Sequence, residues 1–155
     1  MAEGQLKVIC KNRRARFEYH IEETFEAGLV LQGSEVKSLR AGSANLSDSY
    51  GRIRRGELFL VKAHIAPYDQ ARENHEPERD RKLLLHRREI DRIGTRLRER
   101  GYTLVPMQMY FKDGVAKIEV ALARGKRLHD KRQATAKRES ERDMQRLRKR
   151  ERRGR

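Results

Sequence analysis

Alternation of apolar and polar residues predicts short β-strands over most of the chain. Phe17, Tyr19 and Ile21 alternate with charged or polar neighbours, which is the period of a half-buried strand. A second apolar stretch runs from Phe25 to Leu31, and Gly28 within it predicts a bulge or a bend. The pattern therefore indicates a sheet that buries one face.

Four further stretches are joined in pairs by turn residues, and each pair predicts a hairpin. The first pair meets at Arg55-Gly56, and the second at Lys112-Asp113-Gly114. The four predicted strands are 46–54, 57–61, 104–111 and 115–123.

Helical periodicity is confined to two places before residue 124. Residues 83–100 predict a helix with an apolar face and with Gly101 as its C-terminal cap. That face consists of Leu85, Ile90, Ile93 and Leu97. Residues 35–40 predict one or two helical turns that end at Ala41-Gly42.

Short antiparallel strands with few helices predict a mainly β protein. We expect a small antiparallel β-barrel of the oligonucleotide-binding type with flanking helices, because closure removes exposed strand edges. A chain of 155 residues favours one domain with an appendage. We place the domain at 1–123 and a basic C-terminal tail at 124–155.

The positive charge of the chain is concentrated in that tail, and it indicates what kind of partner the protein binds. The chain carries a net charge of +15. Residues 124–155 hold fifteen Lys and Arg against five Asp and Glu. Such a field attracts polyanions, and nucleic acid is favoured because binding phosphates releases condensed counterions.

The tail has too few apolar residues to fold alone, so we expect disorder in the free protein. It lacks helix breakers from Lys126 to Arg153, and Ala136, Ser140, Met144 and Leu147 form one thin stripe. Folding into a helix on a partner is therefore expected, and a solvated tail with no single conformation is the alternative.

Catalytic and metal-binding patterns are absent from the sequence. No histidines stand at a metal-ligand spacing, and Gly125-Lys126 lacks the other residues of a phosphate loop. Cys10 lies near Lys11 and two arginines, which could lower the pKa of its thiol, but it has no histidine beside it in the sequence. We predict no enzymatic activity, cofactor or metal. The single cysteine and the lack of a long apolar run favour a soluble, cytoplasmic protein without a membrane role.

Several ordered blocks of residues closely resemble one known family. They include 12–16 (NRRAR), 21–28 (IEETFEAG), 33–42 (GSEVKSLRAG), 44–46 (ANL), 48–50 (DSY), 64–68 (HIAPY), 81–86 (RKLLLH), 101–106 (GYTLVP) and 125–132 (GKRLHDKR). These blocks resemble SmpB, the SsrA-binding protein family, over about residues 8–132.

The resemblance implies an RNA-binding adaptor of trans-translation. Members bind the tRNA-like domain of transfer-messenger RNA and, with elongation factor Tu, deliver it to stalled ribosomes. The resemblance further implies that the tail probes the decoding centre of the small subunit and the empty mRNA channel. We expect a monomer.

Site residues follow from the resemblance, position by position. The expected RNA-binding residues are Asn12, Arg14, Tyr19, Glu26, Arg40, Asn45, Tyr50 and Lys126. The expected ribosome-binding residues are His129, Asp130, Lys131, Arg132 and Leu147. Glu26 would accept hydrogen bonds from a guanine edge or form a structural ion pair, and the sequence leaves both open.

The tail departs from the family pattern. Many members carry a tryptophan near the position of Ser140, and Arg148 replaces an apolar residue. Channel binding is therefore expected to depend more on arginine. Three rival functions remain: a structural ribosomal protein of similar fold, an RNA-processing enzyme, and membrane binding by the tail, which its thin apolar stripe disfavours.

Overall fold

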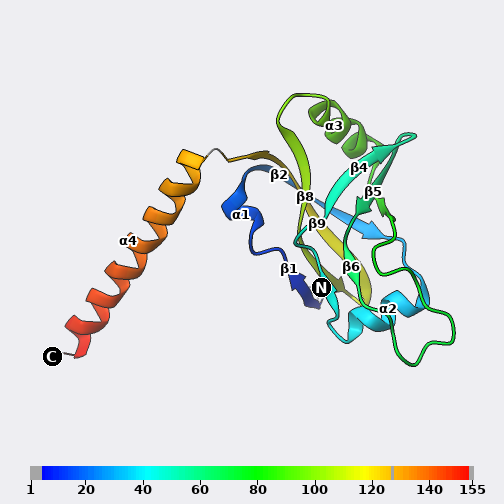
Figure 1. Ribbon diagram of the computed structural model, residues 1–155, viewed down its shortest axis with the longest axis horizontal. Helices are drawn as coiled ribbons and strands as arrows, with labels where there is room; N and C mark the ends of the chain where they lie inside the picture. Colours follow the sequence, from blue (N-terminus) through cyan, green and yellow to red (C-terminus); the bar gives the residue numbers. More distant parts are fainter. Residues whose placement is uncertain (1–4, 127, 154–155) are drawn as a thin grey trace. The chain divides into compact units, whose positions relative to one another are not determined.

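The computed structural model describes residues 5–126 and 128–153, and for residues 128–135 and 150–153 it describes the backbone only. The chain divides into two units, one ending at Gly125 and the other starting at Lys126 (Figure 1). The last strand of the first unit thus continues two residues past the predicted boundary. No helix among the described residues has the length and apolar character that a membrane span needs.

The first unit is a ring-like antiparallel sheet with three flanking helices (Figure 1). Its strands are β1 (Leu6–Lys11), β2 (Tyr19–Leu29), β3 (Ala44–Asn45), β4 (Tyr50–Arg54), β5 (Glu57–Val61), β6 (His64–Ile65), β7 (Arg81–Leu84), β8 (Tyr102–Lys112) and β9 (Val115–Gly125). Its helices are α1 (Ala15–Glu18), α2 (Gly33–Arg40) and α3 (Arg87–Leu97).

The large sheet closes on itself, which confirms the predicted barrel. The strand order is β1-β8-β4-β5-β7-β2-β9, and β8 also pairs with β9. Strand β1 extends the sheet along the second half of β8, and β3 and β6 form a separate two-stranded sheet. Inside the ring, Leu58, Leu60, Leu104 and Ile118 are fully buried.

Both predicted hairpins form, and their turns explain why. Arg55 and Gly56 have φ values of 53° and 75°, and Asp113 and Gly114 have 51° and 79°. Two successive residues with positive φ match the twist of antiparallel strands. The first hairpin is shorter than predicted because its first strand starts at Tyr50.

Three local predictions were wrong, in addition to the C-terminal cap of the helix, which lies at Arg98 rather than at Gly101. Phe17 lies in the short helix α1 rather than in a strand, because the turn buries Ala15 against Met107 and Ala121. Leu83 belongs to β7 rather than to the helix, since it pairs with Leu58. A run of leucines fits both the helical and the strand period, so the long-range pairing with Leu58 determines that Leu83 is in a strand.

Gly28 is the third correction. The bulge of β2 lies between Ile21 and Glu23, and Gly28 pairs regularly with both Leu84 and Lys117. A Cβ atom at Gly28 would stand 3.3 Å from the Cβ of Leu84. Glycine is used here for close packing of two strands.

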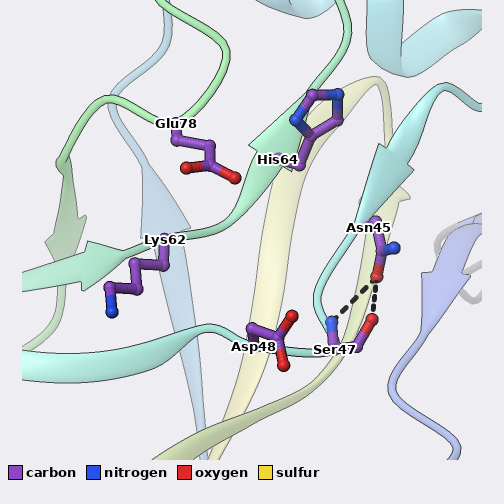
Figure 2. A pocket seen from close by; sticks show the side chains of 6 residues that line it. All are labelled: Asn45, Ser47, Asp48, Lys62, His64 and Glu78. Atoms are coloured by element: carbon purple, nitrogen blue, oxygen red, sulfur yellow. Dashed lines mark hydrogen bonds between the residues drawn. The ribbon is translucent and has the colours of Figure 1, made fainter.

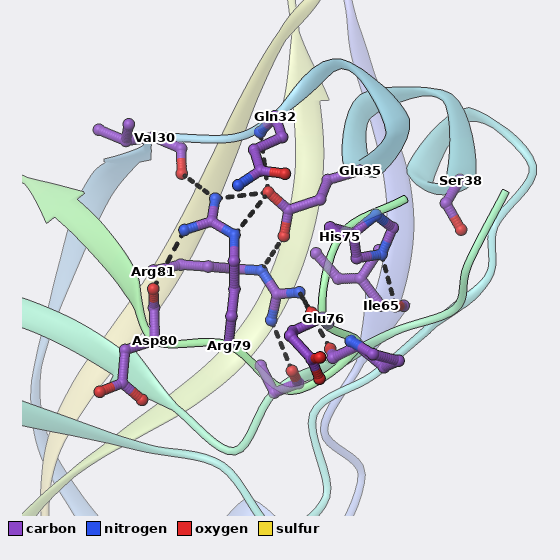
Figure 3. Close-up of polar contacts among 12 residues, drawn as sticks. Val30, Gln32, Glu35, Ser38, Ile65, His75, Glu76, Arg79, Asp80 and Arg81 are labelled. Atoms are coloured by element: carbon purple, nitrogen blue, oxygen red, sulfur yellow. Dashed lines mark hydrogen bonds and ion pairs between the residues drawn. The ribbon is translucent and has the colours of Figure 1, made fainter. Parts of the chain in front are cut away.

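A buried ionic network fixes α2 and the long segment between β6 and β7 (Figure 3). The Glu35 carboxylate accepts hydrogen bonds from Arg79 and Arg81, and the side chains of Glu35 and Arg81 are fully buried. Arg81 also donates to the backbone carbonyls of Ala63 and Pro77. Burial alone would raise the pKa of Glu35, but hydrogen bonds from the two arginines and from the Gln32 amide hold it below its ordinary value.

His75 secures the same segment. Its Nε2 lies 2.8 Å from the carbonyl oxygen of Ile65, and its Nδ1 lies 2.8 Å from the Ser34 hydroxyl. Ser38 donates to the carbonyl of Ala66. The network therefore holds β6, and with it one wall of the site described next, against α2.

The second unit is one long helix, α4 (Leu128–Arg153). The described side chains of residues 136–149 are all exposed. Met144 and Leu147, two members of the predicted stripe, are each more than half exposed. The helix thus displays its apolar stripe to solvent.

Candidate RNA interface

Three hollows adjoin one another on the barrel and share lining residues. The central hollow shares Asn12 with the second and Ser47 and Asp48 with the third. Together they form a continuous depression from α1 to β6. Its walls come from six separate segments of the chain, so the closed sheet is what brings them together.

The central hollow, of about 270 Å³, contains Asn12, Tyr19 and Tyr50. Tyr19 begins β2 where α1 ends, and Tyr50 begins β4, so both rings lie where strands start. Both side chains are half-buried. Three of the eight predicted RNA-binding residues therefore converge on one site.

Asn12 is more enclosed than an RNA-reading residue would need to be. Its side-chain amide donates to the carbonyl oxygens of Pro106 and Leu46, at 3.0 and 3.4 Å, and the residue is buried. Its backbone amide also donates to Met107. These bonds make Asn12 a brace between β1, β8 and the segment that leads into β4.

The second hollow is lined by basic residues beside α1. Lys11, Arg13 and Arg16 lie around it, together with Gln108 and Glu119. Gln108 donates to Glu119 at 3.5 Å. The three cations make this end of the depression suited to phosphate oxygens.

The third hollow has about 730 Å³ and mixed polarity (Figure 2). Its lining residues are Asn45, Ser47, Asp48, Lys62, His64 and Glu78. The Oδ1 atom of Asn45 accepts from both the amide and the hydroxyl of Ser47. Asn45 is thereby a fourth predicted residue in the depression, and its bond to Ser47 fixes the turn that carries Asp48.

Comparisons with known proteins identify the family. The model of the SmpB protein family matches residues 9–150. The chain belongs to the SmpB family. An SsrA-binding protein from Desulforudis audaxviator is 58% identical over 94% of this chain and 96% of its own length. One from Pelobacter propionicus is 56% identical over 89% of this chain and 91% of its own length.

A solved structure of the family shares the fold. It is described as "tmRNA-SmpB: a journey to the center of the bacterial ribosome", with a TM-score of 0.66 and 47% identity. The similarity covers 81% of this chain and 93% of that one. The family resemblance of the sequence is therefore confirmed.

The other four predicted RNA-binding residues do not line the three hollows. Arg14 is exposed at the N-terminal cap of α1, and Arg40 is exposed in the last turn of α2. Lys126 is the first residue of the second unit. Glu26 lies on β2, opposite Glu119 of β9.

Glu26 is engaged within the protein. Its carboxylate accepts a hydrogen bond from the Tyr110 hydroxyl and lies 3.4 Å from the Nζ atom of Lys112. The Tyr110 hydrogen bond, helped by Lys112 and Lys117, lowers the pKa of Glu26. Burial, together with Glu26, raises the pKa of Tyr110. The structural ion pair left open by the sequence is therefore present.

Cys10 differs from the expectation based on its neighbours in sequence. Burial raises the pKa of its thiol to about 11, opposed by a backbone hydrogen bond involving Met109. The nearby cations do not lower it, because the side chain faces the core from β1. At neutral pH the residue is a protonated thiol packed against the core.

The predicted ribosome-binding residues lie on α4. Leu147 is exposed there. The side chains of His129, Asp130, Lys131 and Arg132 lie outside the described residues, although the helix includes their backbone.

Sequence reasoning missed four side chains of the third hollow: Asp48, Lys62, His64 and Glu78. Asp48 and His64 stood within resembling blocks, but neither was assigned a role. Exposed Lys, Asp and Glu are common on any surface, so no local pattern marks them. The one unusual feature, a φ of 64° at Lys62, is visible only in the structure.

Proposed function

We propose that this chain is the RNA-binding adaptor of trans-translation. In this proposal the barrel binds the tRNA-like domain of transfer-messenger RNA, and the complex enters stalled ribosomes. The observation that carries it is the continuous depression, in which Tyr19 and Tyr50 lie between a cationic end and a mixed polar end. The family membership supports the choice of RNA.

The chemistry of the depression suits a folded RNA with unpaired bases. Lys11, Arg13 and Arg16 can neutralise phosphates, and tyrosine rings can stack on splayed bases. Asn12 acts in this proposal mainly by holding the wall in place. Arg14 and Arg40 extend the cationic surface of the barrel beyond the hollows, and Lys126 adds a cation at the start of the second unit. Glu26 orients Lys112.

We assign the ribosome-facing role to α4. The helix carries a large share of the positive charge and exposes Leu147 on its thin stripe. His129, Asp130, Lys131 and Arg132 would reach the decoding centre, and the rest of the helix would occupy the empty mRNA channel. Elongation factor Tu would join the same complex, with the chain present as a monomer.

A gel-shift titration tests the RNA-binding part of the proposal. The full chain is titrated against the tRNA-like domain of transfer-messenger RNA at two salt concentrations, with excess ordinary tRNA as competitor. Binding that survives the competitor is the expected result. Binding that the competitor abolishes, with only a steep salt dependence left, would indicate a generic polycation and favour a ribosomal protein.

A further inference from the structure

The third hollow differs from the rest of the depression in its charge. It contains two carboxylates, Asp48 and Glu78, in a chain of net charge +15. Carboxylates repel phosphate oxygens, so this end is poorly suited to an RNA backbone. They accept hydrogen bonds from the N–H groups of nucleobases.

The ionisable groups of the hollow are uncommitted. These groups are the side chains of Asp48, Lys62, His64 and Glu78. In the part of the chain that the structure describes, none of the four forms a hydrogen bond or ion pair with another residue. By contrast, Glu26 and Glu35 are both engaged by internal donors. The donors and acceptors of the hollow are therefore available to a ligand.

The frame around these groups is fixed. Asn45 and His64 face each other across the β3–β6 pair, and Asn45 anchors Ser47 immediately before Asp48. Lys62 has a φ of 64°, a left-handed conformation that is costly for a residue with a Cβ atom. The hollow of about 730 Å³ lies within the range of roughly 300–1,000 Å³ that is typical of ligand pockets.

We propose that this hollow is a nucleobase pocket that reads an unpaired guanine of the bound RNA. Guanine is the base that presents two adjacent donors, N1–H and N2–H, which match the two oxygens of the Asp48 carboxylate. It also presents O6 and N7 as acceptors, which a lysine such as Lys62 can contact. The imidazole of His64 supplies a flat surface for stacking.

Other bases fit this arrangement less well. Adenine presents its amino group next to ring nitrogens that only accept, and uracil presents one N–H between two carbonyls. Cytosine presents one amino donor. For each of these bases, one oxygen of the carboxylate would face an acceptor or remain unpaired, which costs affinity.

The inference rests on the proposed RNA-binding function and adds base specificity to it. The test uses the full chain and single-stranded seven-nucleotide RNAs that carry guanosine, inosine or adenosine between uridines. Inosine lacks only the N2 amino group of guanosine. Fluorescence anisotropy measures each affinity for the wild type, for Asp48→Asn, and for the control Asp69→Asn, which removes an exposed carboxylate outside the hollows.

The expected result is that the wild type and Asp69→Asn prefer the guanosine RNA over the inosine RNA by about tenfold. Asp48→Asn should bind the two equally, with its affinity for the adenosine RNA unchanged. The thermal midpoint of Asp48→Asn should match the wild type, because the Asp48 side chain forms no hydrogen bond or ion pair within the described part of the chain.

Two outcomes would overturn the inference: a wild type that does not discriminate, or an Asp48→Asn variant that still prefers guanosine. If the wild type still binds the tRNA-like domain against competitor tRNA, only the base pocket is refuted. Loss of that competitor-resistant binding would instead refute the proposed function itself.

Discussion

The barrel and the C-terminal helix obtain their order in different ways. The barrel surrounds a core in which Leu58, Leu104 and Ile118 are fully buried, and each strand is paired. In α4 the described side chains are exposed, and its apolar stripe has no partner among them. Isolated helices gain little stability in water without a packed face. We therefore expect the barrel to fold alone and the helix to depend on its partner for stability.

The largest expected effect concerns the buried ionic network of the barrel. In Glu35→Gln, the fully buried Arg81 guanidinium loses its anion, and a cost of about 3–5 kcal/mol in the free energy of unfolding is expected. Urea denaturation measures it. The matched control Glu57→Gln breaks an exposed pair with Lys82 and should cost about 0–1 kcal/mol. Similar losses in the free energy of unfolding of both variants would contradict the conclusion that burial makes the Glu35–Arg81 pair important for stability.

The next effect concerns the central hollow rather than stability. Tyr19→Ala and Tyr50→Ala should each weaken binding to the tRNA-like domain by about tenfold, which corresponds to loss of one base stack. Tyr68→Ala is the control, since Tyr68 is also half-buried but contacts Lys37 outside the hollows. Gel-shift affinities that fall equally in all three variants would argue against a site at the central hollow.

A substitution in α4 should distinguish the activity assigned to the helix from the RNA binding assigned to the barrel. Leu147→Asp should impair tagging on stalled ribosomes and leave the affinity for the tRNA-like domain intact, because the residue is exposed on α4. The free energy of unfolding should change by less than about 0.5 kcal/mol. A translation assay that detects tagged peptide is run beside the gel shift. Equal loss of both activities would refute the separation.

The smallest expected effect is a pH dependence within the barrel. The Tyr110 hydrogen bond lowers the pKa of Glu26 in the folded state, so its contribution to stability is present above the unfolded value of 4.5. It is lost as the pH falls through the lowered folded value. Tyr110→Phe should therefore reduce the loss of thermal stability between pH 6 and pH 2. If Tyr110→Phe lost as much thermal stability as the wild type between pH 6 and pH 2, the assignment of this pH dependence to the Glu26–Tyr110 hydrogen bond would be contradicted.

The sequence predicts the elements of the barrel better than its site. Alternation and the residues at Gly56 and Gly114 locate both hairpins, because strand period and turn geometry are local. Leu83 was misplaced because its role depends on pairing with Leu58, far along the chain. The family resemblance selected Tyr19 and Tyr50 as site residues.

The hollow near β6 lies beyond sequence reasoning for a physical reason. Asp48, Lys62 and Glu78 come together only when the barrel closes and the Glu35–Arg81 network holds the segment before β7. The sequence pointed instead to Glu26 as a carboxylate that reads RNA, and the structure shows that Tyr110 and Lys112 engage it. Availability for a ligand depends on internal partners, which only the fold reveals.

Hydrogen–deuterium exchange of the full chain tests the division between barrel and helix most directly. It is measured for the free protein, for the complex with the tRNA-like domain, and for the complex on stalled ribosomes. The account predicts protected β2, β8 and β9 amides in all three states, with residues 136–149 protected only on the ribosome. Protection of residues 136–149 in the free protein would contradict it, because the helix would then be stable without a partner.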